Sequence, residues 1–354
     1  AAPPSYEESS AVDATVLPQL AANGEDVEAA DDAAWVVDAT VDDVEEGTEV
    51  VLVARTDDGW SEVDEQETDG DGHVALTSRE SGDLHVVVGD GDDAIGAEVS
   101  TDDAPEATFT DDFDEDTVDE EGATWLTRDQ GYIGVRTCSR ASADAAEVTD
   151  GVLELSVTED PEREGDECQL PGRRKRFPYR LNGHVGTNGG FDFKYGVAAA
   201  RIKMHKSQGQ HASFWSQPTN ENGPHSDGHE IDVIEYFGDK HPQGGLTSFI
   251  HWYKGKRLIK TGSWIKDSKS FLKNKRDGWS KNYHVFSVEW TPRVIIFRID
   301  GKETWRTSAR VSKEQQYLIL SLLASDYEAL EMNDKKLPQH MYVDWVRVWE
   351  TPQS

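Results

Sequence analysis

Short runs that alternate apolar with polar residues fill the chain from Asp111 to its end, and they constrain the fold more than any other feature. Examples are GVLELSV, HASFWSQ, HEIDVIEYF and RVIIFRID, separated by turn residues. A period of two is the pattern of half-buried antiparallel strands, whereas an amphipathic helix repeats every 3.6 residues. So many strands in one region predict an all-β sandwich or barrel.

Charge is distributed unevenly along the chain. Residues 1–110 contain 31 Asp and Glu against two Arg and no Lys, and the whole chain has a net charge of −34. Such an acidic module cannot bind nucleic acid or an anionic membrane surface. No apolar run approaches the roughly 18 residues of a membrane-spanning helix. We therefore expect no nucleic-acid and no membrane partner, and a chain that acts as a monomer.

Composition divides the chain into three parts. Residues 1–30 are rich in Ala, Pro, Ser and acidic residues with little periodicity, and we expect them to be disordered. Residues 31–104 hold short β-rich runs such as WVVDATV and TEVVLVART between acidic turns. These runs predict a small β-sandwich that resembles the immunoglobulin-like modules appended to secreted bacterial enzymes. Residues 105–354 form the second domain.

The chain has two cysteines, Cys138 and Cys168. A disulfide between them would close a loop of about 30 residues and add roughly 3 kcal/mol of stability. The alternative is a pair of free, buried thiols. The low cysteine count and a sequence that begins at Ala1 rather than Met favour the disulfide and a processed protein. We expect a secreted, extracellular protein.

The segment GHEIDVIEY, residues 228–236, carries three carboxylates on one predicted strand. Glu230 and Asp232 share a face because side chains alternate along a strand. Glu235 reaches the same face only if a β-bulge adds one residue. Glu230 and Glu235 are then four regular steps apart, roughly 13 Å between Cα atoms. If both side chains lean inward, their carboxyls end about 5–6 Å apart, which favours retaining over inverting glycosidase chemistry.

Three like charges on one face repel one another, so their presence indicates a use. Catalysis is one explanation, in which Glu235 starts protonated because nearby charges and apolar walls raise its pKa. A metal site is the competing explanation, although no histidine stands at ligand spacing within the strand. A solvated edge strand is the third. Aromatic residues of the flanking segments favour a sugar-binding cleft; they are Trp215, Tyr236, Phe237 and Trp252.

The chain resembles glycoside hydrolase family 16 in its bulged Glu-x-Asp-x-x-Glu form. The resemblance covers about residues 107–350 and rests on the motifs above together with KYGVAAARIKM, LTSFIHWY and MYVDWVRVWE, which occur in the family's order. The resemblance implies a concave, two-sheet β-jelly roll and an endo-acting, retaining glycoside hydrolase. It implies Glu230 as nucleophile, Asp232 as its electrostatic helper and Glu235 as acid/base. A β-1,3-glucan is the expected polysaccharide substrate, ahead of a galactan or anionic polymer. A transglycosylase and a non-catalytic, lectin-like binding protein are the alternatives.

The resemblance also implies further site residues. The candidates for binding substrate are Trp215, His251, Trp252 and Trp264, with His251 expected near the acid/base. No cofactor is expected for catalysis. A structural Ca²⁺ is implied at Asp112, the backbone of Gly151 and Asp344, although the family commonly has Glu where this chain has Asp112.

Two departures from the family bear on the substrate. The segments 172–180 and 254–278 are rich in Lys and Arg, which is unusual beside a neutral glucan. If they line the cleft, the substrate is anionic; otherwise they are a solvated face. The second departure is SLLASDYEAL before the last strand, where many β-1,3-glucanases have a small, Gly-rich stretch.

Overall fold

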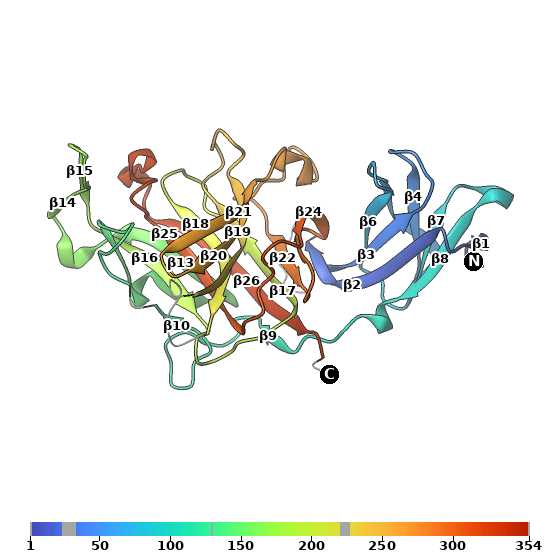
Figure 1. The fold of residues 1–354 in the computed structure, drawn as a ribbon, viewed down its shortest axis with the longest axis horizontal. Helices are drawn as coiled ribbons and strands as arrows, with labels where there is room; N and C mark the ends of the chain where they lie inside the picture. The colour runs from blue at the N-terminus through green and yellow to red at the C-terminus, as the bar shows by residue number, and fades with distance from the viewer. Residues whose placement is uncertain (1, 23–32, 129, 220–226, 353–354) are drawn as a thin grey trace. The chain divides into compact units, whose positions relative to one another are not determined.

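The computed structural model describes residues 2–22, 33–128, 130–219 and 227–352. Their regular structure consists of β-strands and short 3₁₀ helices (Figure 1). No helix among these residues is long and apolar enough to cross a membrane. The chain divides into two compact units, one built mainly from residues up to Ala107 and the other mainly from Thr108 onward.

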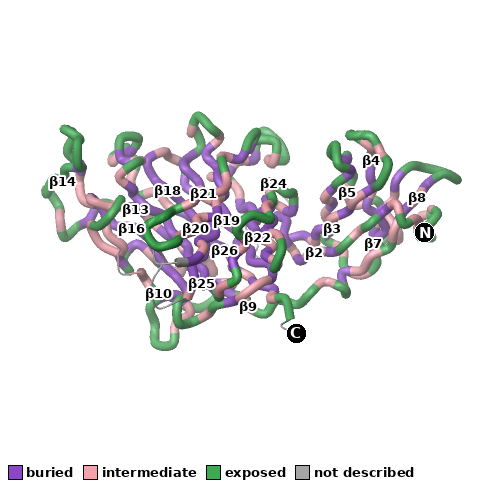
Figure 2. Tube along the Cα trace, viewed as in Figure 1, coloured by how far each residue is buried: buried purple, intermediate pink, exposed green. Residues whose placement is uncertain are grey.

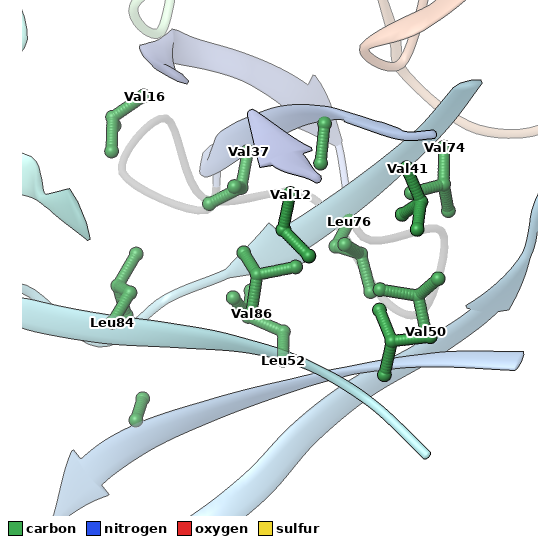
Figure 3. Packing of buried hydrophobic residues seen from close by; sticks show 13 residues of the cluster. Val12, Val16, Val37, Val41, Val50, Leu52, Val74, Leu76, Leu84 and Val86 are labelled. Atoms are coloured by element: carbon green, nitrogen blue, oxygen red, sulfur yellow. The ribbon is translucent and has the colours of Figure 1, made fainter. Parts of the chain in front are cut away.

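The N-terminal unit is a small β-sandwich of two sheets, ordered β1-β8-β7-β4-β5 and β2-β3-β6. Its strands are β1 (Glu7–Glu8), β2 (Val12–Ala22), β3 (Ala33–Val41), β4 (Glu49–Thr56), β5 (Gly59–Glu67), β6 (His73–Ser78), β7 (Asp83–Val88) and β8 (Ile95–Ser100). Both sheets contribute to one apolar cluster, with Val37 and Leu76 from one sheet and Leu52 and Val86 from the other (Figure 3).

The prediction of disorder over residues 1–30 is wrong for residues 7–22. Strand β2 pairs antiparallel with β3, with Val16 opposite Val37. Val12 and Val16 are buried in the sandwich core. The Ala-rich, acidic composition hid a strand that is stabilised by tertiary pairing rather than by its own periodicity. Ala1 and residues 23–30 of the predicted segment lie outside the described residues.

The remaining strands belong mainly to the second unit. They are β9 (Phe109–Asp111), β10 (Leu126–Thr127), β11 (Ser139–Ala141), β12 (Ala146–Thr149), β13 (Val152–Glu159), β14 (Glu167–Gln169), β15 (Arg176–Pro178), β16 (Arg180–Gly186), β17 (Gly196–Lys203), β18 (His211–Pro218), β19 (Asp227–Tyr236), β20 (Leu246–Lys254), β21 (Arg257–Trp264), β22 (His284–Trp290), β23 (Ile295–Ile299), β24 (Lys302–Thr307), β25 (Gln316–Leu323) and β26 (Gln339–Glu350). Short 3₁₀ helices span Gly91–Asp93, Thr101–Asp103, Ala143–Ala145, Pro161–Arg163, Ser268–Phe271, Ala329–Glu331 and Asp334–Lys336.

The main strand path of this unit runs β21-β20-β19-β18-β25-β16-β13-β26-β17-β22-β23-β24. The sheet curls into a jelly roll, with β21 to β16 forming one layer and β13 to β24 the other (Figure 1). Both layers are largely buried along their strands (Figure 2). The predicted architecture, an all-β jelly roll preceded by a small β-sandwich, is confirmed. Strand β19, which carries the three carboxylates, lies inside the first layer between β18 and β20.

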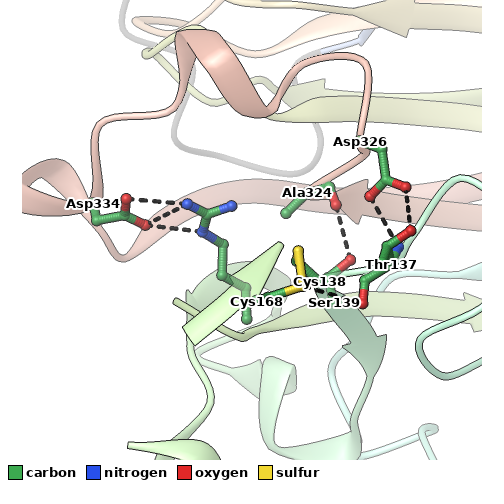
Figure 4. The surroundings of a disulfide bond; sticks show 8 residues. Thr137, Cys138, Ser139, Cys168, Ala324, Asp326 and Asp334 are labelled. Carbon is green, nitrogen blue, oxygen red and sulfur yellow. Dashed lines mark hydrogen bonds and ion pairs between the residues drawn. A yellow bond between two sulfur atoms is a disulfide. The ribbon is translucent and has the colours of Figure 1, made fainter. Parts of the chain in front are cut away.

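Cys138 and Cys168 form the predicted disulfide. The bond packs in a small apolar cluster with Leu170, Phe177 and Ala329. The residues on both sides of Cys138 hold the chain that follows β25 (Figure 4): Thr137 donates from its backbone N and its Oγ1 to Asp326, and Ser139 donates to the carbonyl of Ala324.

Candidate active site

A β-bulge in β19 brings the three carboxylates together, as the spacing predicted. The β18–β19 register places Trp215 opposite Asp232 and Phe214 opposite Ile234, so Val233 has no partner on β18. The β19–β20 register shifts between Asp232 and Glu235 as well. Val233 is buried. One extra residue therefore rotates Glu235 onto the face of Glu230 and Asp232.

The register also gives the spacing of the two glutamates. Glu230 pairs with His251, and Glu235 pairs with Thr247. Their partners are four residues apart on β20, so the two glutamate Cα atoms are about 13 Å apart at roughly 3.3 Å per residue. If both side chains lean inward, their carboxyls are about 5–6 Å apart, close to the spacing of a retaining glycosidase.

Glu230 receives two donors from neighbouring strands. Nε2 of Gln217 donates to its Oε2 at 2.9 Å, and Nδ1 of His251 lies 3.0 Å from its Oε1. The glutamate is 9% exposed. Its carboxylate is therefore held in one orientation while a small part of it faces solvent.

Asp232 is buried beside Glu230 and its Oδ2 has no hydrogen-bond partner of good geometry among the described residues. Burial raises the pKa of Asp232 well above its usual range, and the charges of Glu230 and Glu235 and a hydrogen bond with Glu230 raise it further. The environment of Asp232 therefore favours its protonated form. This agrees with the helper role that the family resemblance implies for it.

Glu235 behaves differently from the sequence-based expectation. Burial raises its pKa, but the charge of His211 and hydrogen bonds from His211 and Thr247 outweigh burial, and the net pKa is lowered. Nε2 of His211 lies 2.7 Å from Oε1, and Oγ1 of Thr247 donates to Oε2 at 2.8 Å. The prediction of a raised pKa is therefore wrong for the ligand-free site, because it did not include the donors His211 and Thr247 of the neighbouring strands.

The candidate substrate residues lie in different places. His251 contacts Glu230 and approaches Asp232, with Nε2 3.5 Å from Oδ2, rather than the acid/base. Trp252 pairs with His229, so alternation puts it on the opposite face of the sheet from the triplet. The structure does not bring Trp252 to the site.

The other two tryptophans lie on the face of the triplet. Trp215 is 8% exposed, and the guanidinium of Arg128 lies 5.3 Å from its ring centroid, which leaves little ring surface for a sugar. Trp264 pairs with Thr247, which binds Glu235. Its ring is stacked on His241 at 4.4 Å between centroids. Trp264 therefore lies on the Glu235 side of the site.

Sequence reasoning missed several groups that surround the triplet. They are His211 and Gln217 of β18, Arg128 and Arg136 before β11, and Lys260 of β21. Alternation in HASFWSQ places residues 211, 213, 215 and 217 on one face. That signal becomes useful only when β18 is known to neighbour β19. The two arginines come from a loop region and have no periodic signal.

A metal ion could be held by Glu230, Asp232 and His251, whose ligand atoms all lie within 4.8 Å of one another. The histidine missing from the strand is supplied by β20, so the sequence argument against a metal site does not hold. The expectation of metal-free catalysis stays a prediction.

The residues expected to bind a structural Ca²⁺ do not fit that ion. Nη1 of Arg201 makes an ion pair with Oδ2 of buried Asp344. Nη2 of Arg347 lies 3.0 Å from Oδ1 of Asp112. Two guanidinium groups thus supply the positive charge that Ca²⁺ would bring to the two aspartates. The implied calcium site is therefore not supported in this chain.

A curled two-layer jelly roll with a bulged carboxylate triplet on an inner strand defines the class: a glycoside hydrolase domain of the endo-β-glycanase type. The chain matches the family model described as "Beta-porphyranase A-D, GH16 domain" over residues 104–351. It belongs to glycoside hydrolase family 16, as the sequence motifs indicated.

The curated relatives that match this chain are related to it only distantly. The chain is 25% identical over 222 residues to "Glucan endo-1,3-beta-glucosidase A1" of Niallia circulans, which covers 57% of this chain and 30% of that protein. It is 30% identical over 118 residues to "Gram-negative bacteria-binding protein 3" of Drosophila melanogaster, covering 32% of this chain and 23% of that protein. The chain thus spans less than a third of the length of either relative.

Solved structures share the fold. The laminarinase catalytic domain of Thermotoga maritima aligns with a TM-score of 0.53 and 20% identity, over 70% of this chain and 99% of that one. The endo-β-1,3-glucanase of Pyrococcus furiosus aligns with a TM-score of 0.55 and 20% identity, over 71% of this chain and 96% of that one.

Proposed function

We propose that this protein hydrolyses internal β-linkages of an anionic galactan with retention of anomeric configuration, outside the cell and as a monomer. The single observation that carries this substrate is a set of three cationic side chains around the triplet: Arg128, Arg136 and Lys260. The match to a porphyranase family model supports a galactan, and the disulfide supports an extracellular protein.

Arg128 lies one side chain away from the proposed nucleophile. Its Nη2 donates to Oε1 of Gln217 at 2.9 Å, and Gln217 in turn donates to Glu230. Its other described hydrogen-bond partners are Tyr317 and His184. Burial lowers the pKa of Arg128. None of these described partners is a carboxylate, so no negative charge is hydrogen-bonded to the guanidinium among them. An anionic substituent of a bound sugar would therefore stabilise the positive charge of Arg128.

Arg136 and Lys260 extend this positive field. Nε of Arg136 is buried and has no hydrogen-bond partner among the described residues, while its Nη1 donates to Gln130. Lys260 pairs with His251, which pairs with Glu230, so all three side chains lie on one face. Lys260 belongs to the basic segment 254–278, which therefore contributes to the triplet face.

A cavity of about 290 Å³ lies beside Arg128. Arg128, Gln130 and Tyr317 line it together with Leu126, Thr127, Gly186 and Asn188. Its walls carry amide, hydroxyl and guanidinium groups, the donors that a charged sugar ring needs. The cavity is the candidate subsite for an anionic sugar unit next to the cleavage point.

The proposed reaction has two steps. Glu230 attacks the anomeric carbon while Glu235 gives a proton to the departing glycosidic oxygen, and a glycosyl–Glu230 ester forms. Water then loses a proton to Glu235, its oxygen bonds to the same carbon, and the ester bond to Glu230 breaks. Asp232 shares its proton with Glu230 and so limits the repulsion between the two carboxylates before attack.

The second candidate is hydrolysis of β-1,3-glucan, which the sequence analysis ranked first. The curated relative named as a glucan endo-1,3-β-glucosidase and the laminarinase structures favour it. The lectin-like alternative gains support from a relative named as a bacteria-binding protein. An intact triplet with oriented donors argues for turnover over binding alone.

The test is release of reducing sugar from matched polymers: a sulfated galactan, the same galactan after chemical desulfation, laminarin and mixed-linkage glucan. We expect the highest kcat/KM on the sulfated polymer and a steep fall with added salt. Arg136→Gln and Lys260→Gln should raise KM on that polymer by about tenfold each. Lys203→Gln, on β17 in the other layer, is the matched control and should leave KM unchanged.

Each outcome assigns a substrate class. Release from laminarin alone would replace the galactan by a neutral glucan and make the cations incidental. No release from any polymer, with binding of Glu230→Gln on a glycan array, would identify a binding protein.

A further inference from the structure

His211, the first residue of β18, connects Glu235 to a distant loop. Its Nε2 lies 2.7 Å from Oε1 of Glu235, and its Nδ1 lies 2.6 Å from the hydroxyl of Tyr327. The ring is stacked on Phe237, with 4.5 Å between centroids and 11° between planes. Glu235 and Tyr327 contact the two ring nitrogens, and Phe237 packs against the face of the ring. These three contacts fix the position of His211.

Tyr327 has two distinct parts. The residue is 54% exposed, yet its hydroxyl lies against the histidine. Burial of that hydroxyl raises the pKa of Tyr327, so the hydroxyl stays protonated over the working pH range. The contact of this hydroxyl with Nδ1 leaves Nε2 as the ring nitrogen that faces Glu235.

Tyr327 belongs to the segment 324–331, which follows β25. Both carboxylate oxygens of Asp326 accept from Thr137, at 2.9 and 2.7 Å (Figure 4). The carbonyl of Ala324 accepts from Ser139 at 2.8 Å.

The disulfide supports the same segment directly. Ala329 packs in the apolar cluster of Cys138 and Cys168. Thr137 and Ser139 stand on either side of Cys138, so the covalent bond braces the two residues that hold the segment. A continuous set of contacts therefore runs from the disulfide through Tyr327 and His211 to Glu235.

We propose that His211 is a positioning residue of the reaction: Tyr327, on the disulfide-braced segment 324–331, fixes its ring, and the ring orients the carboxylate of Glu235. A hydrogen bond to a carboxylate also stabilises its ionised form. The inference rests on the proposed function, in which Glu235 is the acid/base. The ionised form is the one that takes the proton from water in the second step. The contact thus serves ester hydrolysis and opposes the first step, where Glu235 must hold a proton.

Other charged and titratable groups face this pair from each neighbouring element. The charges of Glu230 and Glu235 raise the pKa of Asp232 of β19, and Thr247 of β20 donates to Glu235. The remaining groups are His251 of β20, His205 after β17, and Glu328 and Arg136 near Tyr327. They stay in place in a His211 variant, so a change at Glu235 reports the lost contact.

The first experiment needs no substrate. The side-chain carboxyl of Glu235 is titrated by ¹³C NMR in the full chain and in His211→Ala. We expect its midpoint to rise by roughly one pH unit in the variant, because a donor and a nearby positive charge are lost. His211→Gln retains an N–H donor and should recover at least half of that shift. An unchanged midpoint in His211→Ala overturns the inference.

The second experiment follows the pH dependence of kcat/KM. Its basic limb reports loss of the proton from the acid, and we expect it to move to higher pH in His211→Ala. With an aryl glycoside whose leaving group departs easily, kcat should fall by about tenfold because ester hydrolysis limits the rate. If activity falls at every pH and the basic limb of the profile stays at the same pH, His211 is only structural. That result overturns the inference.

Two further variants keep the test decisive. Tyr327→Phe removes the hydroxyl and keeps the ring, so it should move the NMR midpoint in the same direction by a smaller amount, even if His211→Ala folds poorly. His340→Ala removes a similar histidine–glutamate contact, with Glu154, away from the triplet and should move neither readout. An inactive wild type with a shifted NMR midpoint would refute the proposed function while supporting this contact.

Discussion

Replacing Glu230 by Gln is the sharpest test of the triplet, because it removes a charge and a nucleophile with almost no change of shape. An amide cannot form the glycosyl ester. We therefore expect kcat to fall by at least about 10⁴-fold, which corresponds to roughly 5.5 kcal/mol of lost transition-state stabilisation. The comparison with Glu154→Gln is matched, since Glu154 also lies 3.0 Å from the Nδ1 of a histidine, on the other layer.

The effect of Glu230→Gln on stability follows from the contacts of Glu230. Gln217 and His251 both approach its oxygens. The amide keeps one acceptor, so one contact is lost at about 1–2 kcal/mol. Against this, Asp232 loses a repelling neighbour. The two effects nearly cancel, and the melting temperature should change by less than about 3 °C at neutral pH.

The pH dependence has a definite sign. A carboxyl whose pKa is raised on folding destabilises the protein progressively as pH rises above its unfolded value, about 3.9 for Asp. Asp232 is such a group, and the charge of Glu230 is one cause. The difference in stability between Glu230→Gln and the wild type should therefore shift in favour of the variant as pH rises from 4 to neutrality.

The assay pairs reducing-sugar release on the most reactive polymer with thermal unfolding from pH 4 to 8. Activity above a few per cent of the wild type would refute the nucleophile assignment. A melting temperature lower by more than about 6 °C would mean that Glu230 is chiefly structural. Glu154→Gln should retain full activity.

Three more predictions concern stability. Cys138→Ser should cost roughly 3 kcal/mol, seen as a melting temperature lower by about 6–12 °C; an unchanged value would mean that the loop is held without the bond. EDTA should not change the melting temperature, because Arg201 neutralises Asp344, and a clear drop would restore the calcium site. Hydrogen bonds to His284 and to backbone amides outweigh burial and lower the pKa of Asp277 to about 2. That stabilisation is complete above about pH 4 and is lost as pH falls toward 2, so Asp277→Asn should flatten acid unfolding over this range.

Period-two alternation was enough to predict longer strands of the second domain, such as β13, β18, β19 and β23, and the shared face of Glu230 and Asp232. It did not predict β16, β21 or β24. The bulge was also predictable, because three carboxylates within six residues make sense on one face only if one residue is extra. Strand β2 was not predicted, because its buried valines stand among Ala and acidic residues and its stability comes from pairing with β3. The calcium ligands were inferred one residue at a time from the family resemblance. The arginines that pair with the two aspartates lie elsewhere in the sequence, so that inference did not include them.

The charge balance of the site depends on which strands flank β19, and alternation contains no information about that order. His211 reaches Glu235 from β18, and His251 reaches Glu230 from β20. Considered alone, β19 predicts a raised pKa for Glu235, because its two other carboxylates repel a third negative charge. With β18 beside it the sign reverses, since a histidine at 2.7 Å acts more strongly than like charges farther along the strand. Sequence motifs can therefore identify the three carboxylates, whereas which of them holds a proton in the free site is decided by tertiary neighbours.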